Sequence, residues 1–179
     1  AGQLKGLIAA PDRYRQEMNM GGMAMAMVVG PGGAFAAMAG QTQEMPGSQR
    51  DEMSKELKRN VLIIARGRDG AGLTVNHAGT AKVGDASAEL LEIAHDGAGV
   101  RWAVDPTNGH VLSAAYRGSG PEGPAEMVST YTDYKQVDGV WLPHGETVTQ
   151  NGEPAQTIMI ESFRINPGCD PKLFEKPTP

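Results

Sequence analysis

The sequence predicts a mainly β fold of the α+β class, in which a curved antiparallel meander sheet, a half-barrel, wraps around one main helix. Runs of β-branched and aromatic residues alternate with glycine- and asparagine-containing turns, as in sequential antiparallel strands. Helical periodicity dominates only one segment, after residue 47. Because 179 residues suffice for one well-packed core and are few for two, we expect a single domain over residues 1–179.

The first forty residues predict short strands joined by glycine turns. Residues 13–20 alternate in type, which predicts a half-buried strand. Gly21-Gly22 predicts a turn, residues 23–29 a returning strand, and residues 34–39 a third strand. Residues 3–9 are only weakly apolar, so a strand and a helix both remain open.

One amphipathic helix follows these strands. Ser48 and Asp51 resemble a capping box that would start it, and Gly67 or Gly70 would end it. Apolar residues recur at spacings of four, four and three, which places them on one stripe: Met53, Leu57, Val61 and Ile64. We expect this stripe to pack on the sheet.

The rest of the chain predicts strands and hairpins. Asp138-Gly139 and Asn151-Gly152 are strong hairpin turns, and they separate the last three strands of a meander. A loop is expected at residues 121–124. The expected strands are 73–77, 81–83, 88–95, 100–105, 111–117, 128–134, 140–149 and 155–165.

Composition narrows the classes of partner. A net charge of −5 argues against nucleic acid, because phosphate binding relies on a cationic surface. No apolar run approaches the roughly 20 residues that span a bilayer, so we do not expect a membrane-spanning protein. The one cysteine, Cys169, cannot form a disulfide within the chain.

No motif predicts catalysis. The Gly-x-Ser-x-Gly turn of hydrolases is absent, and no two histidines stand at metal-ligand spacing. Residues 118–123 match Gly-x-Gly-x-x-Gly, but no helix follows to receive a pyrophosphate. We therefore expect no catalytic residue, no metal ligand and no cofactor. The four histidines are interpreted as ordinary strand or surface residues: His77, His95, His110 and His144.

Methionine is the unusual feature, because five of them recur at strand period across a predicted hairpin. Three interpretations remain open: core filling, the lining of an apolar cavity for an acyl chain or peptide side chain, and a soft-metal site for Cu(I). The hypothetical cavity lining comprises Met18, Met20, Met23, Met25, Met27, Met53, Leu57, Val61, Ile64 and Trp102.

Several segments together resemble a known domain. It occurs in bacterial envelope proteins related to the outer-membrane lipoprotein carriers (LolA-like), and behind the catalytic domains of some zinc peptidases of the pitrilysin/insulinase family. The resemblance covers nearly the whole chain. Its segments are 11–17, 32–40, the helix at 50–64, 131–143 (Tyr-Thr-Asp-Tyr-Lys-Gln-Val-Asp-Gly-Val-Trp-Leu-Pro), 151–152, 165–167 and 174–177.

The resemblance implies an exported, non-catalytic protein of the periplasm or cell envelope. Because the zinc motif of the peptidases is missing, our leading hypothesis is a binding and scaffolding module, the C-terminal accessory domain of a pitrilysin-like peptidase whose catalytic domain lies outside this sequence. The alternative is a periplasmic carrier of lipid or lipoprotein that binds acyl chains in an apolar cavity. A third, less favoured hypothesis is a methionine-rich Cu(I)-binding protein.

Overall fold

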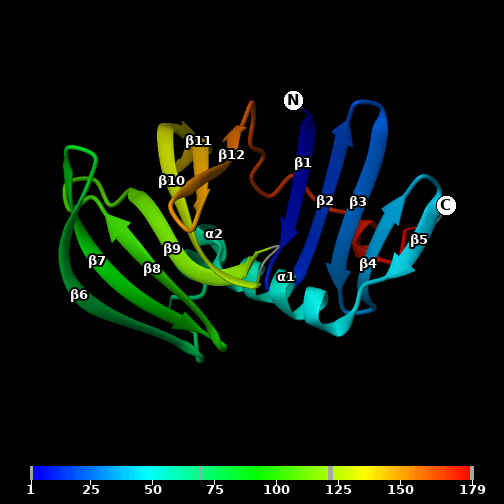
Figure 1. Cartoon of the computed structure of the whole chain (residues 1–179), viewed down its shortest axis with the longest axis horizontal. Helices are drawn as coiled ribbons and strands as arrows, with labels where there is room; N and C mark the ends of the chain where they lie inside the picture. The colour runs from blue at the N-terminus through cyan, green and yellow to red at the C-terminus, as the bar shows by residue number, and fades with distance from the viewer. Residues whose placement is uncertain (1, 69, 121–122, 178–179) are drawn as a thin grey trace. The chain divides into compact units, whose positions relative to one another are not determined.

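The computed structural model describes residues 2–68, 70–120 and 123–177. Two compact units divide the chain: residues 1–63 with 168–179, and residues 64–167. The first contains a five-stranded sheet of order β1-β2-β3-β4-β5, and the second a seven-stranded sheet of order β12-β11-β10-β9-β8-β7-β6 (Figure 1). Each sheet is an antiparallel meander, because every strand pairs with its neighbours in sequence.

The five-stranded sheet follows the predicted strands closely. Gly21 and Gly22 both adopt positive φ (61° and 89°), which explains why this tight turn takes two glycines. The weakly apolar residues 3–9 form a strand. One further strand, β5, was not predicted because its sequence Gln-Thr-Gln-Glu is wholly polar. The strands are β1 Gln3–Ala9, β2 Arg13–Met20, β3 Met23–Gly30, β4 Gly33–Met38 and β5 Gln41–Glu44.

The seven-stranded sheet differs from prediction at three places. The two short pieces at 73–77 and 81–83 form one strand, β6, with an irregularity between His77 and Thr80. β9 extends to Gly120, and β10 begins at Gly123, inside the loop expected over residues 121–124. Residues 121 and 122 of that expected loop lie outside the described residues. The last strand ends at Met159 rather than 165. The strands are β6 Leu73–Val83, β7 Ala86–His95, β8 Ala98–Val104, β9 Val111–Gly120, β10 Gly123–Val137, β11 Val140–Gln150 and β12 Glu153–Met159.

The predicted single helix is in fact two, α1 Gly47–Arg59 and α2 Val61–Arg66. Asn60 separates them: its backbone is extended (ψ 132°), and its side-chain Oδ1 accepts a hydrogen bond of 3.0 Å from the Leu62 N–H. An asparagine that binds a backbone N–H in this way favours a helix start over a helix interior. The short helix η1 (Pro171–Phe174) completes the set.

The predicted capping box is also wrong. The helix begins at Gly47, so that Ser48 already lies inside the first turn, and Pro46 at the cap position makes no side-chain hydrogen bond. The Pro46 carbonyl instead accepts the N–H groups of Gln49 and Arg50, at 3.0 and 3.1 Å. Among the described residues, no helix is long and apolar enough to cross a membrane.

The mainly β, antiparallel class is confirmed, with few helices. The expectation of one continuous sheet is wrong: across the described ranges the strands pair in two sheets. The physical reason is that α1 and α2 stand between β5 and β6, so these successive strands are not joined by a hairpin turn.

Candidate functional site

The first candidate surface is one face of the five-stranded sheet, here called the methionine face. Side chains alternate between the two faces of a strand, so the pairing register decides which residues lie together. Three rows cross the strands on this face, and Met20 pairs with Met23 beyond them. The rows are Leu4–Met18–Met25–Met38, Gly6–Gln16–Met27–Ala36 and Ile8–Tyr14–Val29–Ala34.

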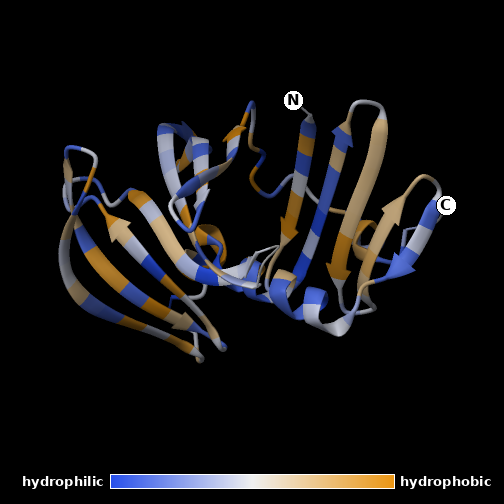
Figure 2. Cartoon of the chain, viewed as in Figure 1, coloured by the Kyte–Doolittle hydropathy of each residue, from blue (hydrophilic) through white to orange (hydrophobic). Residues whose placement is uncertain are grey.

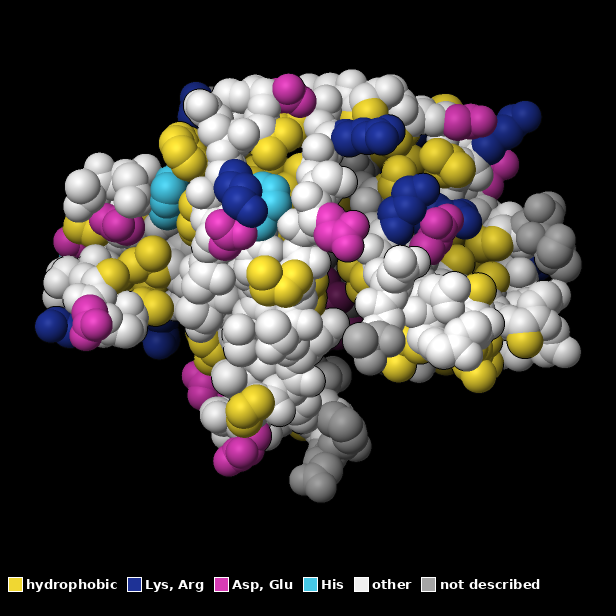
Figure 3. Space-filling model, turned by 90° about the horizontal axis from the view of Figure 1, so that it is seen from above, with side chains coloured by type: hydrophobic (Ala, Val, Ile, Leu, Met, Phe, Trp, Pro, Cys, Tyr) yellow, Lys and Arg dark blue, Asp and Glu magenta, His cyan; other side chains and the backbone are white. Residues whose placement is uncertain are grey.

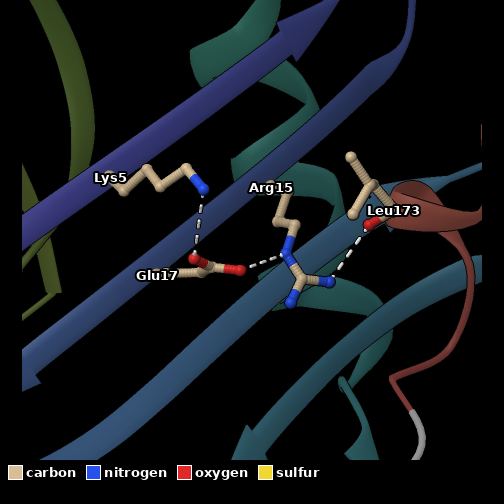
Figure 4. A network of polar contacts seen from close by, with 4 residues as sticks. All are labelled: Lys5, Arg15, Glu17 and Leu173. Atoms are coloured by element: carbon tan, nitrogen blue, oxygen red, sulfur yellow. Dashed lines mark hydrogen bonds and ion pairs between the residues drawn. The ribbon is translucent and has the colours of Figure 1, made fainter. Parts of the chain in front are cut away.

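The opposite face of the same sheet carries charged residues beside the buried Val28 and Phe35, and the end of the chain packs on part of it. The Glu17 carboxylate accepts a hydrogen bond of 2.7 Å from the Arg15 guanidinium, and it lies 3.9 Å from the Lys5 ammonium. The Arg15 guanidinium also donates a hydrogen bond of 3.1 Å to the Leu173 carbonyl (Figure 4). Nearby, Thr42 donates to the Pro177 carbonyl at 3.0 Å. The C-terminal segment therefore occupies this face, which leaves the methionine face as the candidate site.

Helix α1 closes one end of the methionine face. Met53 packs against a buried cluster of Val29, Ala34 and Met45, beside Tyr14 and Met27. Burial, together with the nearby Glu56 carboxylate, raises the pKa of Tyr14 to about 12. This end is thus ordinary core, in agreement with the core-filling interpretation for Met27.

The other end of the methionine face is open. Met20, Met23 and Met38 are 65%, 60% and 51% exposed, and Leu4 is exposed as well. Figure 2 shows β3, which crosses the face, in hydrophobic colours along its length. Hydrophobic side chains also reach the surface between charged ones in the view of Figure 3. Neighbouring exposed apolar side chains typically mark a binding surface.

Not all predicted lining residues belong to this face. The structure brings Met18, Met20, Met23, Met25, Met27 and Met53 to it. Leu57 is buried in α1, and Val61 lies in α2 of the same unit. Ile64 and Trp102, both buried, belong to the unit of residues 64–167.

Met38 and Leu4 extend the open end and were missed from sequence. Met38 lies two and four residues beyond Ala36 and Ala34 on β4, so its side chain points to the same face as theirs. The regular alternation along this strand could have identified it. Leu4 stands in a strand with too few apolar residues to reveal which side is buried.

The seven-stranded sheet carries a second, more polar interior row, Leu91–Trp102–Ala114–Ser129. Among the described residues, the buried Trp102 Nε1 has no hydrogen-bond partner. Burial, and next the Glu146 carboxylate, raise the pKa of Tyr131 on the same strand as Ser129. This row thus contains buried polar groups among apolar neighbours. The groups described in it do not form an acid–base pair.

The four histidines lie in separate local contacts, and His95 Nε2 lies 4.0 Å from the Asp96 carboxylate. His77 is 2.6 Å from Glu89, and His110 stacks on Tyr134 with ring centroids 4.1 Å apart. His144 is buried and meets Phe163 edge to face at 5.1 Å. In the part of the chain that the structure describes, no three His, Cys, Asp or Glu side chains are grouped so as to hold a metal.

The sequence matches no family model and no curated protein. A putative outer-membrane lipoprotein-sorting protein domain from Vibrio parahaemolyticus superposes with a TM-score of 0.58 at 15% identity, covering 96% of this chain and 79% of that one. This chain therefore shares the fold of that Vibrio domain.

Two further structures are similar. A DUF1329 family protein from Desulfovibrio piger has a TM-score of 0.60 at 14% identity, covering 97% of this chain and 80% of that one. A LolA superfamily protein from Nitrosomonas europaea has a TM-score of 0.43 at 14% identity, covering 98% and 87%. At such low identity, the Vibrio and Desulfovibrio structures establish the fold alone.

Proposed function

We propose that this protein carries a lipid or lipoprotein and binds its acyl chain on the open end of the methionine face. The observation that carries the proposal is the exposure of Met20, Met23 and Met38 on one face of a sheet whose other face holds the C-terminal segment. A soluble protein gains by covering such a patch, and acyl chains supply the matching chemistry.

Methionine suits this task. Its unbranched thioether side chain adapts to the varying shape of an acyl chain better than a branched residue does. Each buried methylene contributes about 0.8 kcal/mol, so about ten of them contribute roughly 8 kcal/mol before the costs of association are subtracted. The open face therefore favours an affinity that still permits release to an acceptor.

The shared fold supports the same function. The similar Vibrio domain is described as a putative lipoprotein-sorting protein, and we extend that role to this chain as part of the proposal. It implies work in the periplasm or elsewhere in the cell envelope. We further propose that the chain itself performs no catalysis and serves by binding.

Association with a pitrilysin-like peptidase remains a prediction. The motivating resemblance extends to carriers and to peptidase-associated domains alike, whereas the similar Vibrio structure is described as a putative lipoprotein-sorting domain. We therefore prefer the carrier over the accessory domain.

The test places one positive charge on either side of β3. Met23→Lys puts an ammonium on the open end, where an acyl chain would have to cover it. Ala24→Lys puts the same charge on the opposite face at the next position, which is also exposed. We expect binding of a fluorescent fatty-acid analogue to weaken about tenfold or more, about 1.4 kcal/mol, in Met23→Lys only.

Thermal unfolding followed by circular dichroism controls for misfolding of either variant. Equal binding by wild type and Met23→Lys, both folded, would contradict the proposal. So would equal weakening by Ala24→Lys, because that position does not share the proposed face.

A further inference from the structure

We propose a second capacity for the methionine face: the thioethers of Met18, Met25 and Met38 bind one Cu(I) ion. The proposal goes beyond acyl binding, because it depends on sulfur and not on apolar surface. The methionine repeat alone leaves Cu(I) as one of three interpretations, and the strand register now identifies which methionines are neighbours.

The three residues form one row across three adjacent strands. Met25 on β3 pairs directly with Met18 on β2 and with Met38 on β4. Side chains opposed in this way have Cβ atoms about 4.5–5.5 Å apart. Three rotatable bonds in each side chain allow both outer sulfurs to converge above the central one.

A second pair of sulfurs lies next to the row. Met20 pairs with Met23 at the end of the β2–β3 hairpin, two residues beyond Met18 and Met25 on the same face. Since two residues along a strand span about 6.6 Å, this pair can supply a further ligand by rotation of its side chains. Five thioethers thus share one small surface.

The donor set selects the ion. Neutral, polarizable thioethers favour Cu(I), whereas Mg²⁺, Ca²⁺ and Mn²⁺ prefer carboxylate or carbonyl oxygen. The residues that extend the row on either side are Leu4 on β1 and Gln41 on β5, so no charged oxygen stands next to the three sulfurs in the row. Hard divalent cations are therefore poor competitors here.

Packing and exposure together distinguish these sulfurs from those of Met27 and Met53. Met27 and Met53 are partly exposed but pack on the buried cluster of Val29, Ala34 and Met45. Met20, Met23 and Met38 are instead more than half exposed, and Met18 and Met25 are partly exposed. The open end thus presents sulfur that solvent-borne copper can reach.

The test replaces the row by Leu: Met18→Leu, Met25→Leu and Met38→Leu combined. Leu keeps the size and apolarity of Met and removes the sulfur. The matched control is Met159→Leu on β12, a methionine 70% exposed and outside the row. Cu(I) affinity is measured anaerobically on the full chain by competition with the chromophoric chelator bicinchoninate.

We expect wild type and Met159→Leu to bind one Cu(I) with equal affinity, and the triple variant to bind at least tenfold more weakly. In methyl NMR spectra, Cu(I) should shift the ε-methyl signals of Met18, Met25 and Met38 and leave that of Met159 unchanged. Failure of wild type to compete with the chelator, or equal affinity of the triple variant, would overturn the proposal.

The same variants separate this inference from the carrier function. Met159→Leu, outside the methionine face, should bind the fatty-acid analogue as the wild type does, so both binding activities are measured on the wild type and on this control. Acyl binding without Cu(I) binding would refute the metal site alone, and Cu(I) binding without acyl binding would refute the carrier function alone.

Discussion

Met18 on β2 lies directly opposite Met25 on β3. The pair belongs to the open end of a sheet face whose other end is closed by α1. Closure at one end and exposure at the other divide the methionine face into a packed part and an exposed part, and the exposed part is the one proposed to bind a ligand. The following predictions test each part.

Removal of the buried apolar side chain of α1 should destabilise the fold. Leu57 is only 6% exposed, so Leu57→Ala should lower the free energy of unfolding by about 2–4 kcal/mol, through lost burial and the cavity left behind. Urea denaturation measures this change in the free energy of unfolding. Lys55→Ala, at an exposed position of the same helix, should change stability by less than about 0.5 kcal/mol; similar losses in both would show that Leu57 does not anchor the helix.

Tyr14 should make stability fall at alkaline pH. Its pKa is about 12 in the folded chain and about 10 in an unfolded one, so the unfolded state loses the proton first and is favoured as pH rises between these values. Tyr14→Phe should reduce the difference in urea midpoint between about pH 9 and about pH 11. An unchanged difference would mean that the Tyr14 hydroxyl titrates normally.

The Asn60 side chain should stabilise the start of α2. It accepts the Leu62 N–H at 3.0 Å, and loss of such a cap costs about 1 kcal/mol. Asn60→Ala should lower the urea midpoint accordingly, while Asn60→Asp, which keeps an acceptor oxygen, should restore most of it. A neutral effect of Asn60→Ala would argue that the helix break needs no cap.

A single methyl group added at Gly30 should displace the C-terminal segment from β3. A Cβ on Gly30 would lie 2.5 Å from the Phe174 carbonyl oxygen, so Gly30→Ala must displace η1. Gly32→Ala, where nothing lies within 4 Å, is the control. Limited trypsin digestion after Lys172 should be faster in Gly30→Ala only; equal rates would indicate that the segment is not seated on β3.

The sequence predicts local structure well where a strand shows a clear alternation of residue types. The alternation of residues 13–20 and the Gly21-Gly22 turn sufficed for the first hairpin and for the shared face of its five methionines. Polar β5 carries no such signal, and its strand conformation comes from pairing with β4. The break at Asn60 was missed because the apolar stripe continues across it.

Long-range assignments were harder for a physical reason. Periodicity shows which side of a strand or helix is buried, but it does not show which other element covers it. The sequence pattern therefore groups Ile64 and Trp102 with the methionines as apolar lining, although both belong to the other compact unit. For the same reason two sheets were expected to be one.

Photocrosslinking tests the carrier function most directly. A palmitate analogue with a diazirine in its acyl chain is bound to the full chain and irradiated, and the modified residues are mapped by mass spectrometry. We predict labelling on the methionine face around Met20, Met23 and Met38, and its suppression by excess palmitate. Labelling confined to β6–β12, or labelling that excess palmitate does not suppress, would contradict the account.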